Sequence, residues 1–264
     1  MNKVYALIEK EWYEATRNRM VLFTTLFLPL IFVILPVVML ALTRDIPPSE
    51  SDLNEAPPGM FANPAFAGMS DPEMLQAFMA NQMMILFLVM PLAIPMTIAT
   101  YSIVGEKREK SLEPLLATPI TVPELLFGKA VAAALPGVFA TWLGYSVFLI
   151  AARFFVLSDA VYASLVSPTW LLATLLVAPL LTVLAVTAGL MVSSRVNDPR
   201  AAEQLGMLII LPVVALMFTQ LAGLVFLGPT LVLAVAGGLV LADGAMIYFA
   251  AKLFQRESIL TRWK

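Results

Sequence analysis

Side chains that commonly do chemistry are sparse in this sequence of 264 residues, which contains no histidine and no cysteine. The lack of histidine removes the commonest general base and metal ligand, and the lack of cysteine removes disulfides and thiol chemistry. Gly128-Lys129 resembles the end of a phosphate-binding loop, but Pro123 stands where that motif needs a glycine, and Ala130 follows the lysine. We therefore expect no catalytic, cofactor-binding or metal site on this chain.

The most conspicuous single candidate is Asp243, a carboxylate near the middle of an apolar stretch at 230–251. A charge at that depth in a membrane costs at least about 2.5–3.5 kcal/mol on insertion scales, so such a residue is a candidate for function. The alternative is a structural aspartate, protonated or hydrogen-bonded to Thr219 or Gln220. Asp243 and Gln220 are therefore a candidate intramembrane polar site, open to a structural and to a substrate- or ion-binding interpretation.

A denser set of candidates lies in the segment 105–129, which reads GEKREKSLEPLLATPITVPELLFGK. A charged start is followed by a short apolar patch, a proline break and a new helix with the capping-box spacing Thr121-x-x-Glu124. An amphipathic element held between two spans can dock a soluble partner, although an ordinary interfacial loop would look similar. The residues expected to make such a contact are Glu106, Glu113, Leu115, Leu116, Pro119 and Glu124.

The elements that position these residues are predicted to be membrane helices. Hydrophobic residues make up 60% of the chain, charged residues 13%, and the mean hydropathy is +0.89, whereas a soluble domain is roughly 45–50% apolar and about 25% charged. Six stretches reach the roughly 20 apolar residues needed to cross a bilayer. They are 20–42, 82–104, 130–152, 168–192, 206–227 and 230–251. The fold class predicted is an all-α polytopic membrane protein with six transmembrane helices.

The basic residues predict the orientation of these spans. Of the 16 lysines and arginines, all but Arg44 and Arg153 fall on the side that holds both termini and the loops after spans 2 and 4. The positive-inside rule places that side in the cytoplasm. We therefore expect a multi-pass protein of the cell (inner) membrane, with both termini cytoplasmic.

Two segments outside the spans carry further signals. Residues 1–19 are predicted to form an interfacial amphipathic helix. Its apolar face holds Val4, Leu7, Ile8, Trp12 and Ala15, and its polar face holds Lys3, Glu9, Lys10, Glu14 and Arg17. The acidic, proline-rich segment 43–81 is an external loop, interpreted as a gate or partner surface or, with slight preference, as a solvated connector. A capping box at Ser70 and Glu73 predicts a helix that continues into span 2 and bends near its prolines.

The segment 105–129 also resembles the signature of ABC-2 type transporter permeases. The matching residues are Glu106, Leu112-Glu113, Leu115-Leu116, Thr118-Pro119 and Gly128-Lys129, with Lys110-Ser111 where the family usually has Gly-Thr. The N-terminal residues Ile8-Glu9-Lys10-Glu11 and Arg17-Asn18-Arg19, with Pro29 in span 1, resemble the sodium- and drug-efflux branch of that family.

This resemblance implies a non-enzymatic permease subunit of an ATP-driven exporter, with residues 20–264 as its six-helix domain. Two permease subunits would pair as a homo- or heterodimer, and separate ATP-binding subunits would dock on the loop 105–129 and carry the ATP and magnesium. The expected partners are thus those subunits and the lipid bilayer, with no nucleic acid. The alternatives are an ion-coupled secondary transporter and a membrane scaffold that recruits a soluble partner.

Overall fold

The computed structural model describes residues 2–45, 56–61, 63–108, 120–196 and 198–253. Within these ranges the regular structure is helical. Six segments are long and apolar enough to cross a membrane, and they confirm the predicted number of spans. They are Arg19–Arg44, Asp71–Glu106, Pro123–Ala152, Asp159–Arg195, Arg200–Leu221 and Pro229–Leu253.

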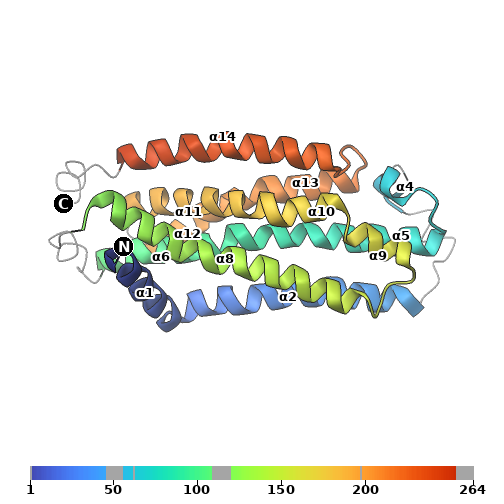
Figure 1. The fold of residues 1–264 in the computed structure, drawn as a ribbon, viewed down its shortest axis with the longest axis horizontal. Helices are drawn as coiled ribbons and strands as arrows, with labels where there is room; N and C mark the ends of the chain where they lie inside the picture. The colour runs from blue at the N-terminus through green and yellow to red at the C-terminus, as the bar shows by residue number, and fades with distance from the viewer. Residues whose placement is uncertain (1, 46–55, 62, 109–119, 197, 254–264) are drawn as a thin grey trace.

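The spans run side by side along the long axis of the molecule (Figure 1). At one end lie α1 (Asn2–Arg17), the end of α6 (Met90–Arg108), the start of α8 (Val122–Ala152) and the end of α14 (Pro229–Leu253). We call this the loop end, because α6 ends and α8 begins there. At the opposite end, the far end, lie α4 (Pro58–Phe61), the start of α5 (Asp71–Met84) and α9 (Asp159–Leu165).

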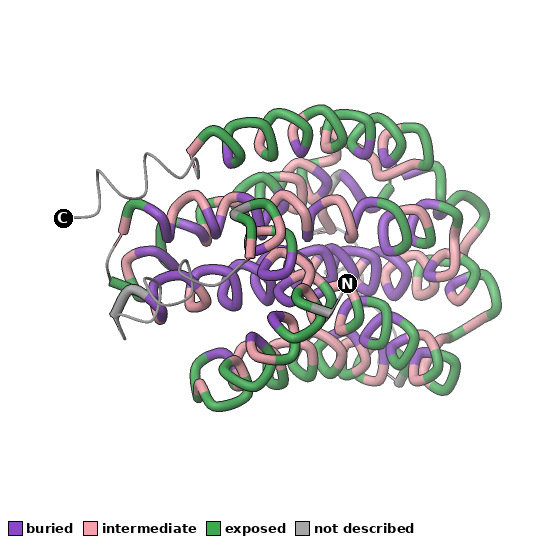
Figure 2. The backbone as a smooth tube through the Cα atoms, turned by 60° about the vertical axis from the view of Figure 1, so that its left-hand side comes forward, coloured by how far each residue is buried: buried purple, intermediate pink, exposed green. Residues whose placement is uncertain are grey.

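The second span forms the centre of the bundle. It consists of α5, the 3₁₀ segment η2 (Ile85–Val89) and α6, and 83% of its most apolar window is buried, against 11% for α2 (Arg19–Asp45) and 17% for α14. Figure 2 shows the same contrast, with buried backbone concentrated in the middle and exposed backbone on the outer helices. The exposed faces of α2 and α14 are rich in large apolar side chains, which suits contact with lipid.

In two spans a proline is preceded by a short 3₁₀ segment. A proline has no N–H to donate, so the carbonyl four residues earlier needs another donor. Before Pro91 the Phe87 carbonyl accepts from Met90 N instead, and before Pro212 the Leu208 carbonyl accepts from Leu211 N. In both cases the N–H that bonds to the carbonyl lies three residues later instead of four, which is the 3₁₀ pattern. Short 3₁₀ segments therefore form at η2 and at η4 (Leu208–Ile210). The predicted bend region in span 2 therefore has a specific hydrogen-bond cause.

Span 4 also contains a proline, Pro179, and it is preceded by a π-helical turn, η3 (Ala173–Val177). This turn lies between α10 (Pro168–Leu172) and α11 (Ala178–Arg195). In this turn Ala178 N donates to the Ala173 carbonyl, so the Thr174 carbonyl would need the N–H that Pro179 lacks. The indole Nε1 of Trp142 on α8 donates to that carbonyl at 2.9 Å. A side chain of span 3 thus supplies the hydrogen-bond donor that this backbone carbonyl of span 4 lacks.

Replacing Trp142 with phenylalanine should therefore destabilise the bundle by about 1–3 kcal/mol, because the Thr174 carbonyl would lose its donor in an apolar setting. The free energy of unfolding in mixed micelles measures this loss. Phe139→Leu is the matched control, since Phe139 is an exposed aromatic residue on the same helix, 65% exposed. Equal stability of Trp142→Phe and the wild type would contradict the role given to the indole.

The predicted bounds of spans 4 and 5 were wrong. Span 5 consists of α12 (Pro199–Met207), η4 and α13 (Leu211–Leu221), and it ends six residues before the predicted Leu227. Gly223 adopts a φ of 72°, and Leu224 N and Gly223 N donate to the carbonyls of Thr219 and Gln220, which is a Schellman stop. Span 4 was predicted to begin at Pro168, but its apolar segment begins at Asp159 with α9.

The described part of the external loop is partly packed, and the choice between a gate or partner surface and a solvated connector stays open. Met60 and Phe66 are 0% and 1% exposed, and they form a small second core with Ala77, Phe78 and Val161. Gly59 is required for this packing, because a Cβ there would lie 2.2 Å from the Gln220 backbone oxygen. The helix predicted from Ser70 is confirmed, with both halves of its capping box formed.

Candidate functional site

The predicted docking residues are only partly within the described structure. Glu113, Leu115, Leu116 and Pro119 lie outside the described residues, so their roles stay predictions. Glu124 is half-buried, and its Oε2 accepts hydrogen bonds from Thr121 N and Oγ1, both at 2.8 Å. It therefore caps α8, as the sequence predicted. Glu106 is different, because its side chain is only 3% exposed and lies in a cluster of charges.

The cluster is centred on Lys129, whose side chain is 1% exposed. Its Nζ lies 2.6 Å from Glu11 Oε1 on α1 and 2.9 Å from Glu106 Oε2 at the end of α6. Glu106 Oε2 forms an ion pair with Lys129 but no hydrogen bond. Ser102 Oγ accepts a hydrogen bond from Lys129 Nζ at 2.8 Å. One buried ammonium thus joins three helices, α1, α6 and α8.

Lys10 completes the cluster from the more exposed side. Its Nζ lies 2.6 Å from Glu106 Oε1, 3.3 Å from Glu14 Oε1 and 3.7 Å from Glu11 Oε1. Burial lowers the pKa of Lys10, but the hydrogen bond to Glu106 and the three nearby carboxylates outweigh that effect and hold the pKa well above its ordinary value. Lys10 is therefore charged throughout the physiological pH range.

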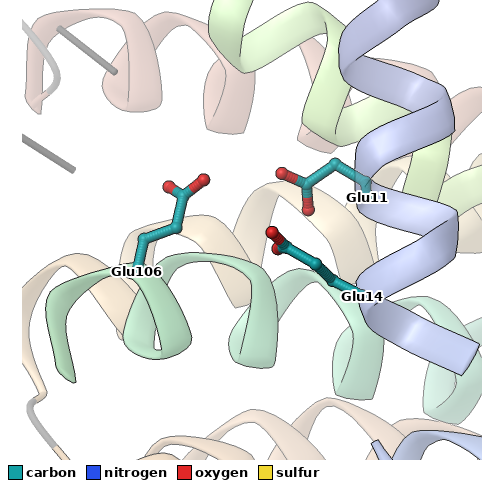
Figure 3. A group of neighbouring side chains, drawn as sticks. All are labelled: Glu11, Glu14 and Glu106. Carbon is teal, nitrogen blue, oxygen red and sulfur yellow. The ribbon is translucent and has the colours of Figure 1, made fainter. Parts of the chain in front are cut away.

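The carboxylates of Glu11, Glu14 and Glu106 turn toward one another between α1 and α6 (Figure 3). One oxygen from each lies within 4.8 Å of the others, which is close enough to hold a metal ion. Lys10 and Lys129 stand among them and supply the positive charge that such a group needs. The arrangement therefore fits a structural ion network.

Apolar packing sets the position of α1 on α8. Leu7, one turn before Glu11, packs against Gly128, where a Cβ would lie 2.6 Å from the Leu7 Cδ2. One residue beyond Glu11, the Trp12 indole Nε1 donates to the Ala132 carbonyl at 2.9 Å. Leu7 and Glu11 are the buried residues of α1, so the predicted amphipathic helix packs along another helix on that side. This packing brings Glu11 to Lys129.

The two ends of the segment 105–129 are tied together by this cluster. Glu106 stands at its beginning and Lys129 at its end, and their charged groups are 2.9 Å apart. The α1 helix braces both through Glu11 and Lys10. The two ends of the segment are therefore held together by ion pairs. A movement of either end would be passed to α1, α6 and α8.

Neither Glu11 nor the role of Lys129 in binding it was predicted from the sequence. Glu11 lies four residues after Leu7 and four before Ala15, on the face predicted to be apolar. A lone acid on such a face of an amphipathic helix signals a buried partner elsewhere. The signal was present, but the partner lies 118 residues away.

The structure places Asp243 and Gln220 apart. Asp243 is 5% exposed on the face of α14 that also buries Val232, Ala236 and Ala250, and neither of its oxygens has a partner among the described residues. It lies fourteen residues into α14, about 21 Å along the helix. Gln220 is at the far end, in the last turn of α13. They do not form one site, and a transport role for Asp243 stays a prediction.

Comparison with known proteins gives one family. A family model described as "ABC-2 family transporter protein" matches residues 5–253, which covers all six spans and α1 from Tyr5 onward. No curated protein matches the sequence.

Proposed function

Because this chain belongs to the ABC-2 transporter family, we propose that it is the membrane subunit of an ATP-driven exporter and works with separate ATP-binding subunits. The family and the six apolar helices make it a multi-pass membrane permease of an ABC transporter. The proposal adds four points. Two permease subunits pair, the loop end faces the cytoplasm, ATP and magnesium bind to the partner subunits, and cargo moves outward across the cell membrane.

The observation that carries this proposal is the ion network at the base of the segment 105–129. An ATPase that docks on this segment must pass its motion to the membrane helices. A free loop would absorb that motion, whereas a loop whose ends are joined by Glu106 and Lys129 passes it to α6 and α8 together. Buried, hydrogen-bonded ion networks are costly to assemble, and specifying one geometry is their best-supported use.

The charge distribution supports the cytoplasmic orientation of the loop end. Among the described residues, Lys3, Lys10, Arg17, Arg19, Lys107, Arg108, Lys129, Arg195, Arg200 and Lys252 belong to this end, and only Arg44 and Arg153 to the far end. Short loops with an excess of lysine and arginine stay in the cytoplasm during insertion. An ATP-binding partner in the cytoplasm would therefore find the segment on its own side of the membrane.

Replacing Leu115 with aspartate should uncouple the complex, because Leu115 belongs to the apolar patch that we propose contacts the ATPase. The expected result is a strong loss of cargo-stimulated ATP hydrolysis by the reconstituted complex, while the permease alone unfolds at the wild-type temperature. Leu224→Asp is the matched control, since Leu224 is 76% exposed in the connection after α13 at the far end. Full ATPase association and stimulation with Leu115→Asp would contradict the docking role.

A further inference from the structure

A cavity of 360 Å³ lies at the far end of the bundle, well away from the ion network. Its wall is built from the external loop, α5, α9, the start of α10 and the end of α13. Small-molecule sites occupy roughly 300–1,000 Å³, so this cavity is at the lower end of the range for a ligand. The family match and the proposed coupling to an ATPase give it no role.

The wall is polar but uncharged. Three amide side chains and three hydroxyl side chains line it, with one tryptophan and four apolar residues and no lysine, arginine, aspartate or glutamate in its described lining. The amides belong to Asn63, Asn81 and Gln220, and the hydroxyls to Ser164, Ser167 and Thr169. Amides and hydroxyls supply both donors and acceptors, whereas this lining offers no counter-charge for an ion.

Part of the wall is held rigid by its own hydrogen bonds. The Trp170 indole Nε1 donates to Asn81 Oδ1 at 2.5 Å, and Asn81 Nδ2 donates to Ser164 Oγ at 3.2 Å. Asn63 accepts from Ala65 N at 3.0 Å and so fixes the turn at η1 (Pro64–Phe66). A wall whose polar groups are already oriented has less entropy to lose when a ligand binds.

Other polar groups of the wall have no bond of this kind. Gln220 is 3% exposed, and its Oε1 has no hydrogen-bond partner in the described structure. An unpaired buried acceptor costs about 1–3 kcal/mol, which a ligand hydroxyl could recover after a rotation of the amide. The Ser167 side chain makes no capping bond to α10. The cavity thus combines a fixed wall with unused hydrogen-bonding capacity.

We propose that this cavity binds an uncharged, hydroxyl-rich group, a small sugar or polyol, presented either as a free molecule or as the headgroup of a glycolipid. An ion would find no opposite charge in the described lining, and a purely apolar ligand would leave the amides and hydroxyls without partners. A hydroxyl-rich group both donates to and accepts from such side chains. The position at the far end puts the site opposite the loop end, and its assignment does not depend on the proposed ATPase.

Because the chain contains no cysteine, a single introduced thiol reports on the cavity without background. Ala163→Cys places a thiol in the lining, on the exposed side of α9. Ala67→Cys is the matched control, because Ala67 is also exposed at the far end but does not line the cavity. The full chain is labelled with a maleimide in phosphatidylcholine nanodiscs, which avoids detergents with sugar headgroups. The probes are maltose, glycerol and, in separate nanodiscs, a monoglucosyl diacylglycerol.

The expected result is slower labelling of Ala163→Cys and unchanged labelling of Ala67→Cys. A free ligand at about ten times its Kd should slow labelling about tenfold. Protection by maltose or glycerol identifies a soluble ligand, and protection by the glycolipid alone identifies a lipid headgroup. Gln220→Leu, added to Ala163→Cys, should weaken the protection, and because Gln220 Oε1 has no partner to lose, this variant should fold. Thr169→Val provides a second variant of nearly the same shape.

The proposal is overturned if none of the three probes protects Ala163→Cys, since the cavity would then hold water only. It is also overturned if protection is equal at Ala67→Cys, or if Gln220→Leu and Thr169→Val both leave the protection unchanged. Sodium chloride and sodium phosphate should give no protection at either thiol, because the described lining is uncharged. Protection by either salt would contradict the proposed ligand class.

Discussion

Lys129→Met should destabilise the protein by about 3–5 kcal/mol, the usual cost of removing one partner from a buried ion network. The methionine keeps the length of the side chain, but it leaves Glu11 without its ion pair at 2.6 Å and Glu106 with Lys10 alone. The free energy of unfolding in mixed micelles measures the loss. We also expect cargo-stimulated ATP hydrolysis by the complex to fall strongly, because α1 would no longer brace the segment 105–129.

Two further variants separate this effect from a simple loss of charge. Lys252→Met removes an exposed lysine at the same end of the bundle and should change stability by less than about 0.5 kcal/mol. Glu11→Leu combined with Lys129→Met replaces the buried pair with apolar side chains, which is often neutral, so at least half of the lost stability should return. If the double variant is as unstable as the sum of the single ones, Glu11 and Lys129 do not act as a pair.

Gln76→Leu should cost about 2–4 kcal/mol, since two backbone groups of the α8–α9 connection would lose their partner. The side chain of Gln76 is fully buried in α5, and its Oε1 accepts from Leu157 N at 2.8 Å. Its Nε2 donates to the carbonyls of Phe155 and Leu40, at 3.1 and 3.0 Å. Non-helical backbone inside a membrane protein needs such internal partners, because lipid offers none.

The thermal unfolding of the purified chain, followed by intrinsic fluorescence, checks this prediction. Gln204→Leu is the control, because Gln204 is an exposed glutamine on α12. Leucine has nearly the volume of glutamine, so a loss in Gln76→Leu reports on hydrogen bonds more than on packing. An unfolding temperature equal to that of Gln204→Leu would show that the α8–α9 connection does not depend on Gln76.

The spans and helix starts could be predicted because their signals are local. Hydrophobic length alone gives the six membrane segments, and Thr121 with Glu124 marks the start of α8 three residues apart. The end of span 5 was predicted wrongly because the length of an apolar run does not show where the helix ends within it. The apolar run continues to Leu227, whereas Gly223 turns the chain out of the helix. Glycine after a helical run was the available signal.

The partners within the site could not be predicted from spacing. Glu11 and Lys129 are 118 residues apart, and Gln76 contacts carbonyls 36 and 79 residues away. Sequence distance carries no information about such pairs, because the order in which six helices pack decides which side chains meet. The Trp142 bond to Thr174 is a similar case, since it depends on a π-turn that Pro179 permits but does not dictate.

The joining of α1 to α8 also sets an order of events during synthesis. Glu11 leaves the ribosome 118 residues before Lys129, which at about 5–20 residues per second is a delay of about 6–24 s. During that time α1 has no buried ammonium to neutralise Glu11, and Glu106, the partner of Lys10, is also made late. The first helix to emerge therefore cannot complete its ion pair with α8 until the start of span 3 has been made, when three further spans are still to come.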